Sequence, residues 1–487
     1  MKATFFKSLL ICSVSLFSLS VFASPCDGQS GTTHPNGGGF KSNNATVADS
    51  VYIGSSAQVC DHASLTGNVR VEGSASVEDL VHMSGYAKIK DTARAYGNAS
   101  LEAYSTVSGN ARVYGTARVY GTSRVYDNAN VYGSAKVYGL AKVYGKAKVY
   151  DSAQVYGGSH ATSTPGAQVY QNARVWNNAR VYDSARVRLG AHISGSGRVY
   201  GTAEVHGYAK VRNGARVYGN ASVSGQDRTR RVQILNTARV YGNARITGHV
   251  KVYDRAKVYG SAYLISQVQV YDDAQVYGNA ELKGNSRIYG SAKVYGFSRT
   301  EHSARIYGDA IVNGGSVTQK AKVRGNGKVY GTAHILGGAH VYGDAQLYGS
   351  AVANDTAKIY GNALVYGDAS IRGSSKIYEN AKVYGHAHIA ESAKVYGYAQ
   401  VKTYSTVRGS AKVYGSAVID TSGAGSVSQN AKVYGNGQVL VNGIATGDSE
   451  TYGNAAILGE IGGTAKAYGT CVVGVGQTLT SGNCDGS

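Results

Sequence analysis

A repeat of six residues runs through almost the whole chain and limits what it can fold into. Residues 111–116 read Ala-Arg-Val-Tyr-Gly-Thr, residues 117–122 repeat the same order, and the pattern continues from about residue 45 onwards. Ala and Val are two residues apart, so they lie on one face of an extended segment, while the residue between them and the Tyr lie on the opposite face. The Gly and the polar residue after it supply a turn, because Gly and Asn tolerate a positive φ. Each repeat therefore predicts one short strand and one corner.

The tyrosine position of the repeat indicates how many repeats make one coil. Ala and Val keep the same positions from repeat to repeat, so we expect all strands to run in the same direction around a coil. Between residues 241 and 408, other residues replace Tyr at intervals of 18, in two series: Thr247, Ile265, Lys283, Glu301, then Leu336, Asn354, Arg372, Ala390, Arg408. We interpret 316–320 as a five-residue repeat that shifts the second series by one residue. Three repeats per coil predict a three-sided coil, with the length irregularities at 227–231, 316–320, 423–430 and 461–464 on one face.

We therefore expect an all-β fold, a single long three-sided parallel β-helix with 18 residues per coil and about 24 coils over residues 45–482. Coils stacked about 4.8 Å apart give a rod roughly 115 Å long. Ala and Val fill a narrow interior, with Val119, Val137 and Val155 stacked inward on one side. Residues 24–44 are expected to form an N-terminal cap or linker, and 483–487 a C-terminal tail. Charged residues make up only 16% and hydrophobic residues 43% of the chain, which argues against disorder.

The first 23 residues have the character of a secretory signal peptide. Lys2 and Lys7 form a short basic start, and an apolar run over 9–22 is too short to span a bilayer comfortably. Residues 21–23, Val-Phe-Ala, resemble a cleavage site, so we predict cleavage after Ala23 and a secreted, periplasmic or cell-surface location. No second apolar run of spanning length follows, and we expect no membrane span in the mature chain.

The cysteines support an oxidising compartment. Cleavage removes Cys12 and leaves two cysteines near each end of the chain: Cys26, Cys60, Cys471, Cys484. Three pairings are open, and proximity favours Cys26–Cys60 and Cys471–Cys484, each contributing about 3 kcal/mol through loop entropy. The repeat places Cys471 inward and Cys484 outward, so the chain must leave register after about Thr480 for them to meet. No CxxC or His/Cys cluster accompanies them, and we expect no metal site.

The Ala-x-Val repeat resembles the hexapeptide-repeat, left-handed parallel β-helix family, in which a small and an aliphatic residue stand two apart. The resemblance covers about residues 45–482 and implies a left-handed coil. The sequence departs from the commonest repeat of that family by placing Tyr after the aliphatic residue, where Gly is frequent. The Tyr-Gly form looks like a subgroup of long, poorly characterised bacterial proteins. Many family members are acyltransferases that resemble one another in using a His base, a cleft between subunits and an acyl-CoA donor.

An acyltransferase is therefore the alternative function. The nearest approach to a catalytic group is His386, His388 and Glu391, with His386 at a corner and His388 at an outward position. No long loop extends from the repeats to close over a substrate, and export would separate the chain from cytoplasmic acyl-CoA. No GxSxG, P-loop or HExxH pattern occurs, so we expect no catalytic residues and no cofactor. An ice-binding role is less favoured. The flat faces of ice-binding β-helices usually carry regular rows of Thr, whereas the rows here are Tyr and Lys.

The outward residues suggest a binding surface. The formal net charge is +20, or +18 without Lys2 and Lys7, and most basic residues directly precede the inward aliphatic residue. One face is expected to carry a row of cations: Lys251, Arg287, Arg305, Lys322, Lys358, Lys376, Lys394, Lys412, Lys432. The same face is expected to carry a row of tyrosines: Tyr253, Tyr271, Tyr289, Tyr307, Tyr342, Tyr360, Tyr378, Tyr396, Tyr414, Tyr434.

A cationic row beside an aromatic row suits an acidic polysaccharide or another polyanion. The residues expected to bind it are Lys358, Lys376, Lys394, Lys412, Tyr360, Tyr378, Tyr396 and Tyr414. The alternative is that stacked Tyr only stabilise the sheets and that Lys and Arg only prevent aggregation. The sequence favours an exported, non-enzymatic structural or adhesive rod.

Overall fold

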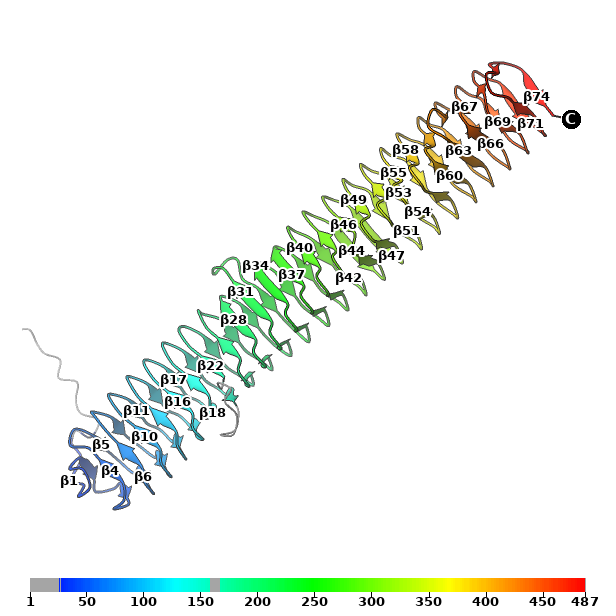
Figure 1. Ribbon diagram of the computed structural model, residues 1–487. Helices are drawn as coiled ribbons and strands as arrows, with labels where there is room; N and C mark the ends of the chain where they lie inside the picture. Colours follow the sequence, from blue (N-terminus) through cyan, green and yellow to red (C-terminus); the bar gives the residue numbers. More distant parts are fainter. Residues whose placement is uncertain (1–25, 27, 158–166, 487) are drawn as a thin grey trace, which may run out of the picture.

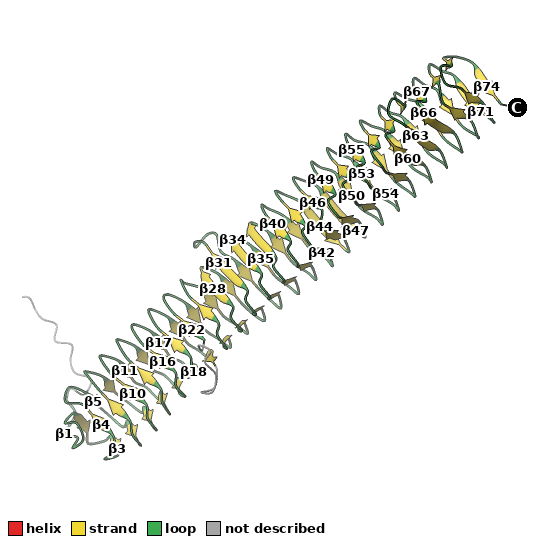
Figure 2. Cartoon of the chain, viewed as in Figure 1, coloured by secondary structure: helices red, strands yellow, loops and turns green. Residues whose placement is uncertain are grey.

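The computed structural model describes residue 26 and residues 28–157 and 167–486, which form one extended rod of stacked coils (Figure 1). The described residues contain strands, turns and loops but no helix (Figure 2). The strands belong to three sheets of 26, 24 and 24 strands. We call these the first, second and third sheet, after the order in which the chain enters them at β2 (Phe40–Ser42), β3 (Thr46–Val47) and β4 (Tyr52–Ile53).

One repeat shows how the sequence builds a coil. In β14 (Arg112–Val113), Val113 and the preceding Ala111 are fully buried, whereas Arg112 is exposed. The N–H of Arg112 donates to the carbonyl of Ala129 in the next coil (2.9 Å), and the N–H of Tyr114 donates to that of Val131 (3.0 Å). Every coil is therefore bonded to the next along its length, and the side chains alternate between core and solvent as the repeat predicts.

The stacking of the interior confirms the predicted fold class. Val119 pairs with Val137 and Val137 with Val155, in β15 (Arg118–Val119), β18 (Lys136–Gly139) and β21 (Gln154–Gly157), and all three valines are fully buried. In the regular coils, strand partners are 18 residues apart, and the rod has about 24 coils. A three-sided parallel β-solenoid is thus observed.

Corners explain why Gly follows Tyr. Gly361 has φ 67°, and a Cβ there would lie 2.8 Å from the backbone nitrogen of Glu379 in the next coil. Glu379 itself has φ 59°, and its carboxylate accepts a hydrogen bond from the N–H of Gly397, one coil further (2.9 Å). An acidic side chain at this corner therefore stabilises a backbone conformation that is otherwise unfavourable for residues other than Gly.

Changes in the 18-residue step lie at the corners beside the third sheet, as the sequence predicts. The shortening predicted at 461–464 lies instead between β69 (Ala456–Ile457) and β70 (Glu460–Ile461). Residues 226–231 are an insertion between the third and the first sheet, and 422–425 lengthen a corner between the second and the third. The strands that flank these segments are β31 (Ser222–Gly225), β32 (Gln233–Ile234), β63 (Val418–Thr421) and β64 (Ser426–Val427).

The single-residue deletion lies one repeat earlier than the sequence predicts. β45 (Ile311–Asn313) keeps the regular register, whereas β46 (Ser316–Val317) pairs one residue early, with Arg299 opposite Ser316. The N–H of Arg299 donates to the carbonyl of Gly315 (3.1 Å), so Gly315 occupies the alanine position and 315–320 form a complete repeat. The sequence does not reveal the position of the deletion, because two successive glycines occur there. Gly314 lies at the corner and Gly315 at the alanine position of the core.

Both ends of the rod are closed by added strands and by the predicted disulfides. β1 (Gly31–Thr33) pairs antiparallel with β2, and Cys26 is bonded to Cys60. At the other end, β74 (Asn483–Asp485) pairs with β71 (Lys466–Tyr468) and places Cys484 opposite the buried Ala467. The register has shifted by one residue between β73 (Thr478–Leu479) and β74, so Cys484 meets Cys471 as expected.

Strands of the first sheet thus lie inside both 24–44 and 483–487. The predicted signal peptide (1–23) lies outside the described residues.

Within the described ranges, no helical segment has the length and apolar character needed to cross a lipid bilayer.

Replacement of Val258 by Asp tests the interior. Val258 in β36 (Lys257–Val258) is fully buried, so Val258→Asp places an unpaired carboxylate among apolar side chains. We expect a loss of about 4 kcal/mol or more in unfolding free energy, measured by circular dichroism during denaturation. The control Lys257→Gln changes the outward neighbour on the same strand and should cost no more than about 0.5 kcal/mol. Equal stability of the two variants would contradict the inward placement of Val258.

The disulfides are testable by peptide mapping without reduction. We expect the Cys26–Cys60 and Cys471–Cys484 peptides, and free thiols at all four positions would contradict the pairing. The double variant Cys471→Ala/Cys484→Ala opens a loop with a sequence separation of 13. The last coil should lose about 3 kcal/mol of local stability. Faster amide hydrogen exchange in β71 but not in mid-rod strands would show this loss.

Candidate polyanion-binding face

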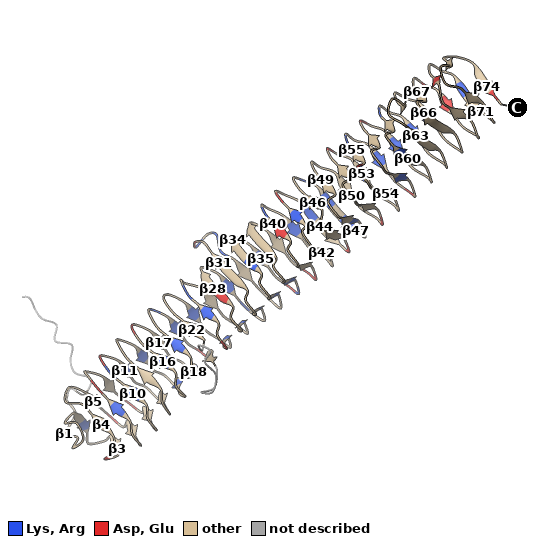
Figure 3. Cartoon of the chain, viewed as in Figure 1, with Lys and Arg blue, Asp and Glu red and all other residues tan. Residues whose placement is uncertain are grey.

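The structure brings the four predicted lysines together in one row. Lys358, Lys376, Lys394 and Lys412 lie opposite one another on successive strands of the first sheet. The strands are β53 (Lys358–Ile359), β56 (Lys376–Ile377), β59 (Lys394–Val395) and β62 (Lys412–Val413). The other five predicted cations occupy the same outward position of the first sheet. Their strands are β35 (Lys251–Val252), β41 (Arg287–Ile288), β44 (Arg305–Gly308), β47 (Lys322–Gly325) and β65 (Lys432–Val433). We call these nine residues the cationic face (Figure 3).

Most of this positive charge has no ionic partner. Of the nine cations, only Lys432 makes an ion pair within 4.0 Å among the described residues, to Glu450 (2.9 Å). Cations elsewhere on the rod are more often neutralised, for example Arg118 by Glu102 (2.8 Å) on the second sheet. Like charges that face each other across strands destabilise a sheet. The cations of this face therefore repel one another, and a bound anion would reduce that repulsion.

Four of the predicted tyrosines, Tyr360, Tyr378, Tyr396 and Tyr414, form a continuous stack beside the four lysines. The ring centroids of Tyr360 and Tyr378 are 5.0 Å apart, those of Tyr378 and Tyr396 4.8 Å, and those of Tyr396 and Tyr414 4.9 Å, with interplanar angles of 4–5°. Each ring covers the face of the next. A ligand along the row therefore meets hydroxyl groups and ring edges, and the aromatic faces are not available for stacking as the sequence had suggested.

Stacking and burial keep these phenols neutral. The pKa of Tyr378 is raised to about 12, first by burial and then by the neighbouring Tyr396 and Tyr360. Burial and the neighbours Tyr253 and Tyr289 raise the pKa of Tyr271 to about 12 in the same way. At neutral pH the row consists of hydroxyl groups, which donate hydrogen bonds to anions.

The second sheet carries a parallel tyrosine row, whereas most of the third sheet does not. On the second sheet, Tyr259 stacks on Tyr277 and Tyr277 on Tyr295 with centroids 4.7–4.8 Å apart. The stacked tyrosines of the third sheet are Tyr126, Tyr144 and Tyr170 among the described residues. The two faces rich in Tyr therefore adjoin each other, and the third sheet is the face that varies.

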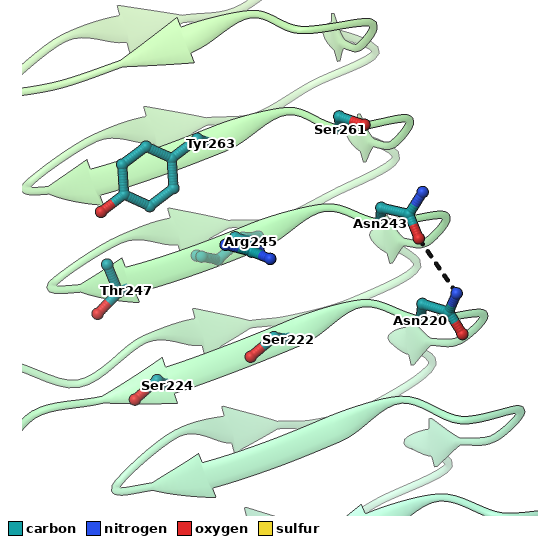
Figure 4. Close-up of a pocket in the computed structure, with 9 residues that line it drawn as sticks. Asn220, Ser222, Ser224, Asn243, Arg245, Thr247, Ser261 and Tyr263 are labelled. Carbon is teal, nitrogen blue, oxygen red and sulfur yellow. Dashed lines mark hydrogen bonds between the residues drawn. The ribbon is translucent and has the colours of Figure 1, made fainter.

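A polar hollow of about 730 Å³ lies on the third sheet, where small side chains replace Tyr. Figure 4 shows its lining on β31, β34 (Arg245–Gly248) and β37 (Tyr263–Ser266) and on the corners before them. At the corner, the side-chain amide nitrogen of Asn220 donates a hydrogen bond to the side-chain oxygen Oδ1 of Asn243 (3.2 Å). The lining consists of hydroxyls, amides, Ile246, Arg245 and Tyr263, without a carboxylate, imidazole or thiol, so it offers no acid–base pair.

The residues of the acyltransferase alternative are not assembled into one group. The Nδ1 atom of His386 lies 3.5 Å from a carboxylate oxygen of Asp368, one coil earlier, and its ring stacks on Tyr404. His388 lies in β58 (His388–Ile389), where burial and Arg372 lower its pKa. In the described part of the chain, no hydrogen bond or ion pair joins His386, His388 and Glu391.

Metal ligation has no candidate in the described ranges. No group of three or more His, Cys, Asp or Glu side chains there is arranged to hold an ion.

The structure shows two further cationic clusters that the sequence analysis did not identify. Arg180, Arg198, Arg216 and Arg239 lie opposite one another on the second sheet. The insertion 226–231 adds Arg228 and Arg231 beside the first sheet, whereas its Arg230 lies near His249. Three arginines in six residues were the available signal for the second cluster, but the sequence did not show which sheet the insertion would cover.

The comparisons with known proteins agree with this architecture. The family model for the YdcK beta solenoid repeat matches residues 304–318 and 357–373, which include β44 (Arg305–Gly308) and β53. No curated protein matches the chain. The chain is a β-solenoid repeat protein.

Alkaline titration tests the tyrosine rows. In the unfolded chain a phenol has a pKa near 10, whereas the folded pKa of Tyr271 and Tyr378 is about 12. The stability that these groups contribute is fully present below about pH 10 and is lost as the pH rises through about 12. We expect tyrosinate absorbance to appear in a steep step together with loss of the β-sheet circular dichroism. Gradual ionisation near pH 10 in a rod that stays folded would contradict the stacked arrangement.

Proposed function

We propose that this β-solenoid repeat protein is an exported, non-enzymatic structural or adhesive rod whose cationic face binds an acidic polysaccharide. The observation that carries the proposal is the row of in-register cations that lack ionic partners. Such a row is costly within the sheet, and a bound polyanion offsets that cost.

The geometry supports an extended ligand that lies along the rod. From Lys358 to Lys432 equivalent lysines recur about every 4.8 Å, so a chain of carboxylates or sulfates meets a new cation at each coil of this stretch. The neutral tyrosine hydroxyls beside them donate hydrogen bonds to the same oxygens. Each contact is weak alone, and affinity comes from many contacts that release counterions together.

Export is supported by two features. Residues 1–23 have the pattern of a secretory signal, and both ends of the rod carry a disulfide. Disulfides persist in oxidising compartments, where acidic surface polysaccharides are also available.

Charge reversal along the row tests the binding face. The variant with Lys358, Lys376, Lys394 and Lys412 replaced by Glu should lose nearly all binding to an acidic polysaccharide such as alginate. Wild-type affinity should fall steeply as salt is raised, because counterion release is the main driving term. Both quantities can be measured by titration calorimetry over a range of salt concentrations, with folding checked by circular dichroism.

The matched control makes the same change in net charge on the third sheet. Lys88, Arg124, Arg245 and Arg408 are exposed there in separate coils, and their replacement by Glu should leave most of the polysaccharide affinity intact. Equal loss in both variants would mean that net charge alone governs binding. Unchanged binding after the four-lysine reversal would leave a purely structural role as the better explanation.

Two further variants separate the remaining roles. Replacing Tyr360, Tyr378 and Tyr396 by Ser should weaken binding, because the hydroxyl groups no longer reach the ligand. The salt dependence should change little, because no charge is altered. Replacing His386 and His388 by Ala should leave polymer binding unchanged. Loss of an acyl-transfer activity in that variant would instead favour the enzymatic alternative.

A further inference from the structure

The insertion 226–231 forms one wall of a basic hollow on the first sheet. It connects β31 to β32 and projects from the outline of the rod beside β31 (Figure 1). The hollow has a volume of about 630 Å³. Its floor is formed by Lys148, Arg174, His192 and Lys210, which lie opposite one another in four successive coils, and Arg228 and Arg231 of the insertion also line it.

The aromatic row of the first sheet is interrupted beside the hollow. Tyr150 stacks on Trp176 with centroids 5.7 Å apart, and the ring of Trp176 then meets the edge of His192 (5.3 Å). The tyrosine position of the next three coils is held by Ser194, Arg212 and Leu235, before tyrosines resume at Tyr253. No residue at the tyrosine position lines the hollow, which lies between the cation row and the corner before that row. The insertion at this corner supplies the rim.

The cations that line the hollow are not neutralised by the protein. Across the described ranges, Lys148, Arg174, Lys210, Arg228 and Arg231 make no ion pair within 4.0 Å. The carboxylate in the insertion, Asp227, accepts hydrogen bonds from the N–H groups of Thr229 (2.7 Å) and Arg230 (2.6 Å) and shapes the loop. It lies 3.8 Å from Arg230, which is not among the residues that line the hollow.

Neighbouring groups respond to this concentration of charge. Burial and then Arg174, Lys210, Arg212 and Arg231 lower the pKa of His192 to about 4, so its ring is neutral at physiological pH. The pKa of Lys210 is lowered by burial and by the same two arginines, Arg212 and Arg231. The Nε atom of Arg212 is buried and has no hydrogen-bond partner. The site thus holds donors and charge in excess of what the fold uses.

The chemistry of the hollow differs from that of the cationic face. Guanidinium groups bind phosphate and sulfate oxygens through two parallel hydrogen bonds, and lysines add point charges. The wall formed by the insertion favours a compact ligand over a long polymer, and the volume is within the usual range of small-molecule sites. We propose that the basic hollow binds a compact polyanion that carries several phosphate or sulfate groups. This proposal does not depend on polysaccharide binding along the cationic face.

Titration calorimetry of the full-length rod with two defined probes tests the site. Inositol hexakisphosphate represents phosphate esters, and sucrose octasulfate represents sulfate esters. Tighter binding of one probe identifies the preferred oxyanion. The double variant Arg228→Gln/Arg231→Gln should bind the preferred probe at least about tenfold more weakly, because it removes two charged donors.

The chain offers a matched control within the same loop. Arg230 borders a different concavity, with Gln226 and His249, so Arg230→Gln removes one charge without changing the lining of the basic hollow. This variant should bind the probe with wild-type affinity. Lys148→Gln/Lys210→Gln alters the floor without touching the insertion, and it should show the same loss as the loop variant even if that variant perturbs the loop.

The outcomes separate this proposal from the proposed function. Failure of the wild-type rod to bind either probe, or equal binding by wild type and both double variants, overturns the basic hollow as a site. The four-lysine variant of the cationic face should bind the compact probe normally. Loss of polysaccharide binding with retained probe binding in that variant supports both proposals. A rod that binds the probe but no polysaccharide overturns only the function proposed for the cationic face.

A spectroscopic readout distinguishes binding in the hollow from adsorption elsewhere. An anion next to Arg174, Lys210, Arg212 and Arg231 offsets the charges that depress the pKa of His192. The pKa of His192, followed by NMR, should therefore rise when the probe is bound. An unchanged pKa of His192 at saturation would place the probe elsewhere on the rod and overturn the proposal.

Discussion

The hydrogen bonds between successive coils are the interaction on which the rest of the molecule depends. Each coil donates N–H groups to carbonyls of the next, as Arg112 does to Ala129 and Tyr114 to Val131. These bonds fix both the spacing and the register of the coils. Because the register is 18 residues and the sequence repeats every six, chemically similar side chains are placed directly above one another. The register of these hydrogen bonds therefore determines which side chains are neighbours, both in the core and on the surface.

This constraint has opposite consequences for different residue types. Val and Ala gain from it, since identical shapes fill a uniform interior. Tyr gains as well, because rings 4.8–5.0 Å apart cover one another and stabilise the sheet edge. Lys and Arg lose, because like charges meet at the same spacing. A sequence that keeps cations at this position over many coils, in most of them without a carboxylate such as the one that accompanies Arg118, retains repulsion that simple solubility does not require.

Much of this architecture could be predicted from the sequence, because the repeat is itself a record of the register. The alternation of Ala and Val predicted the core, and the lapses of Tyr at Thr247, Ile265 and their successors predicted three sides. The position of the deletion was wrong by one repeat, since Gly314 and Gly315 are indistinguishable without the hydrogen bond from Arg299. The cationic face could be listed in advance for the same reason as the core. The basic hollow could not, because it depends on how 226–231 fold back over Lys148, Arg174 and Lys210, and no periodicity describes that contact.

The two corners that flank the third sheet give the rod the character of a one-dimensional crystal whose defects all lie beside one face. Insertions and deletions accumulate there, while each step from the first sheet to the second keeps its six residues from β5 (Gln58–Val59) and β6 (Ser64–Leu65) to β71 and β72 (Val472–Val473). Loss of residues 376–393 would remove one whole coil and bring Lys358 against Lys394, leaving both flanking lattices in phase. The length of the rod can therefore change in steps of one whole coil. Such a change leaves the spacing of side chains along the first and second sheets unaltered.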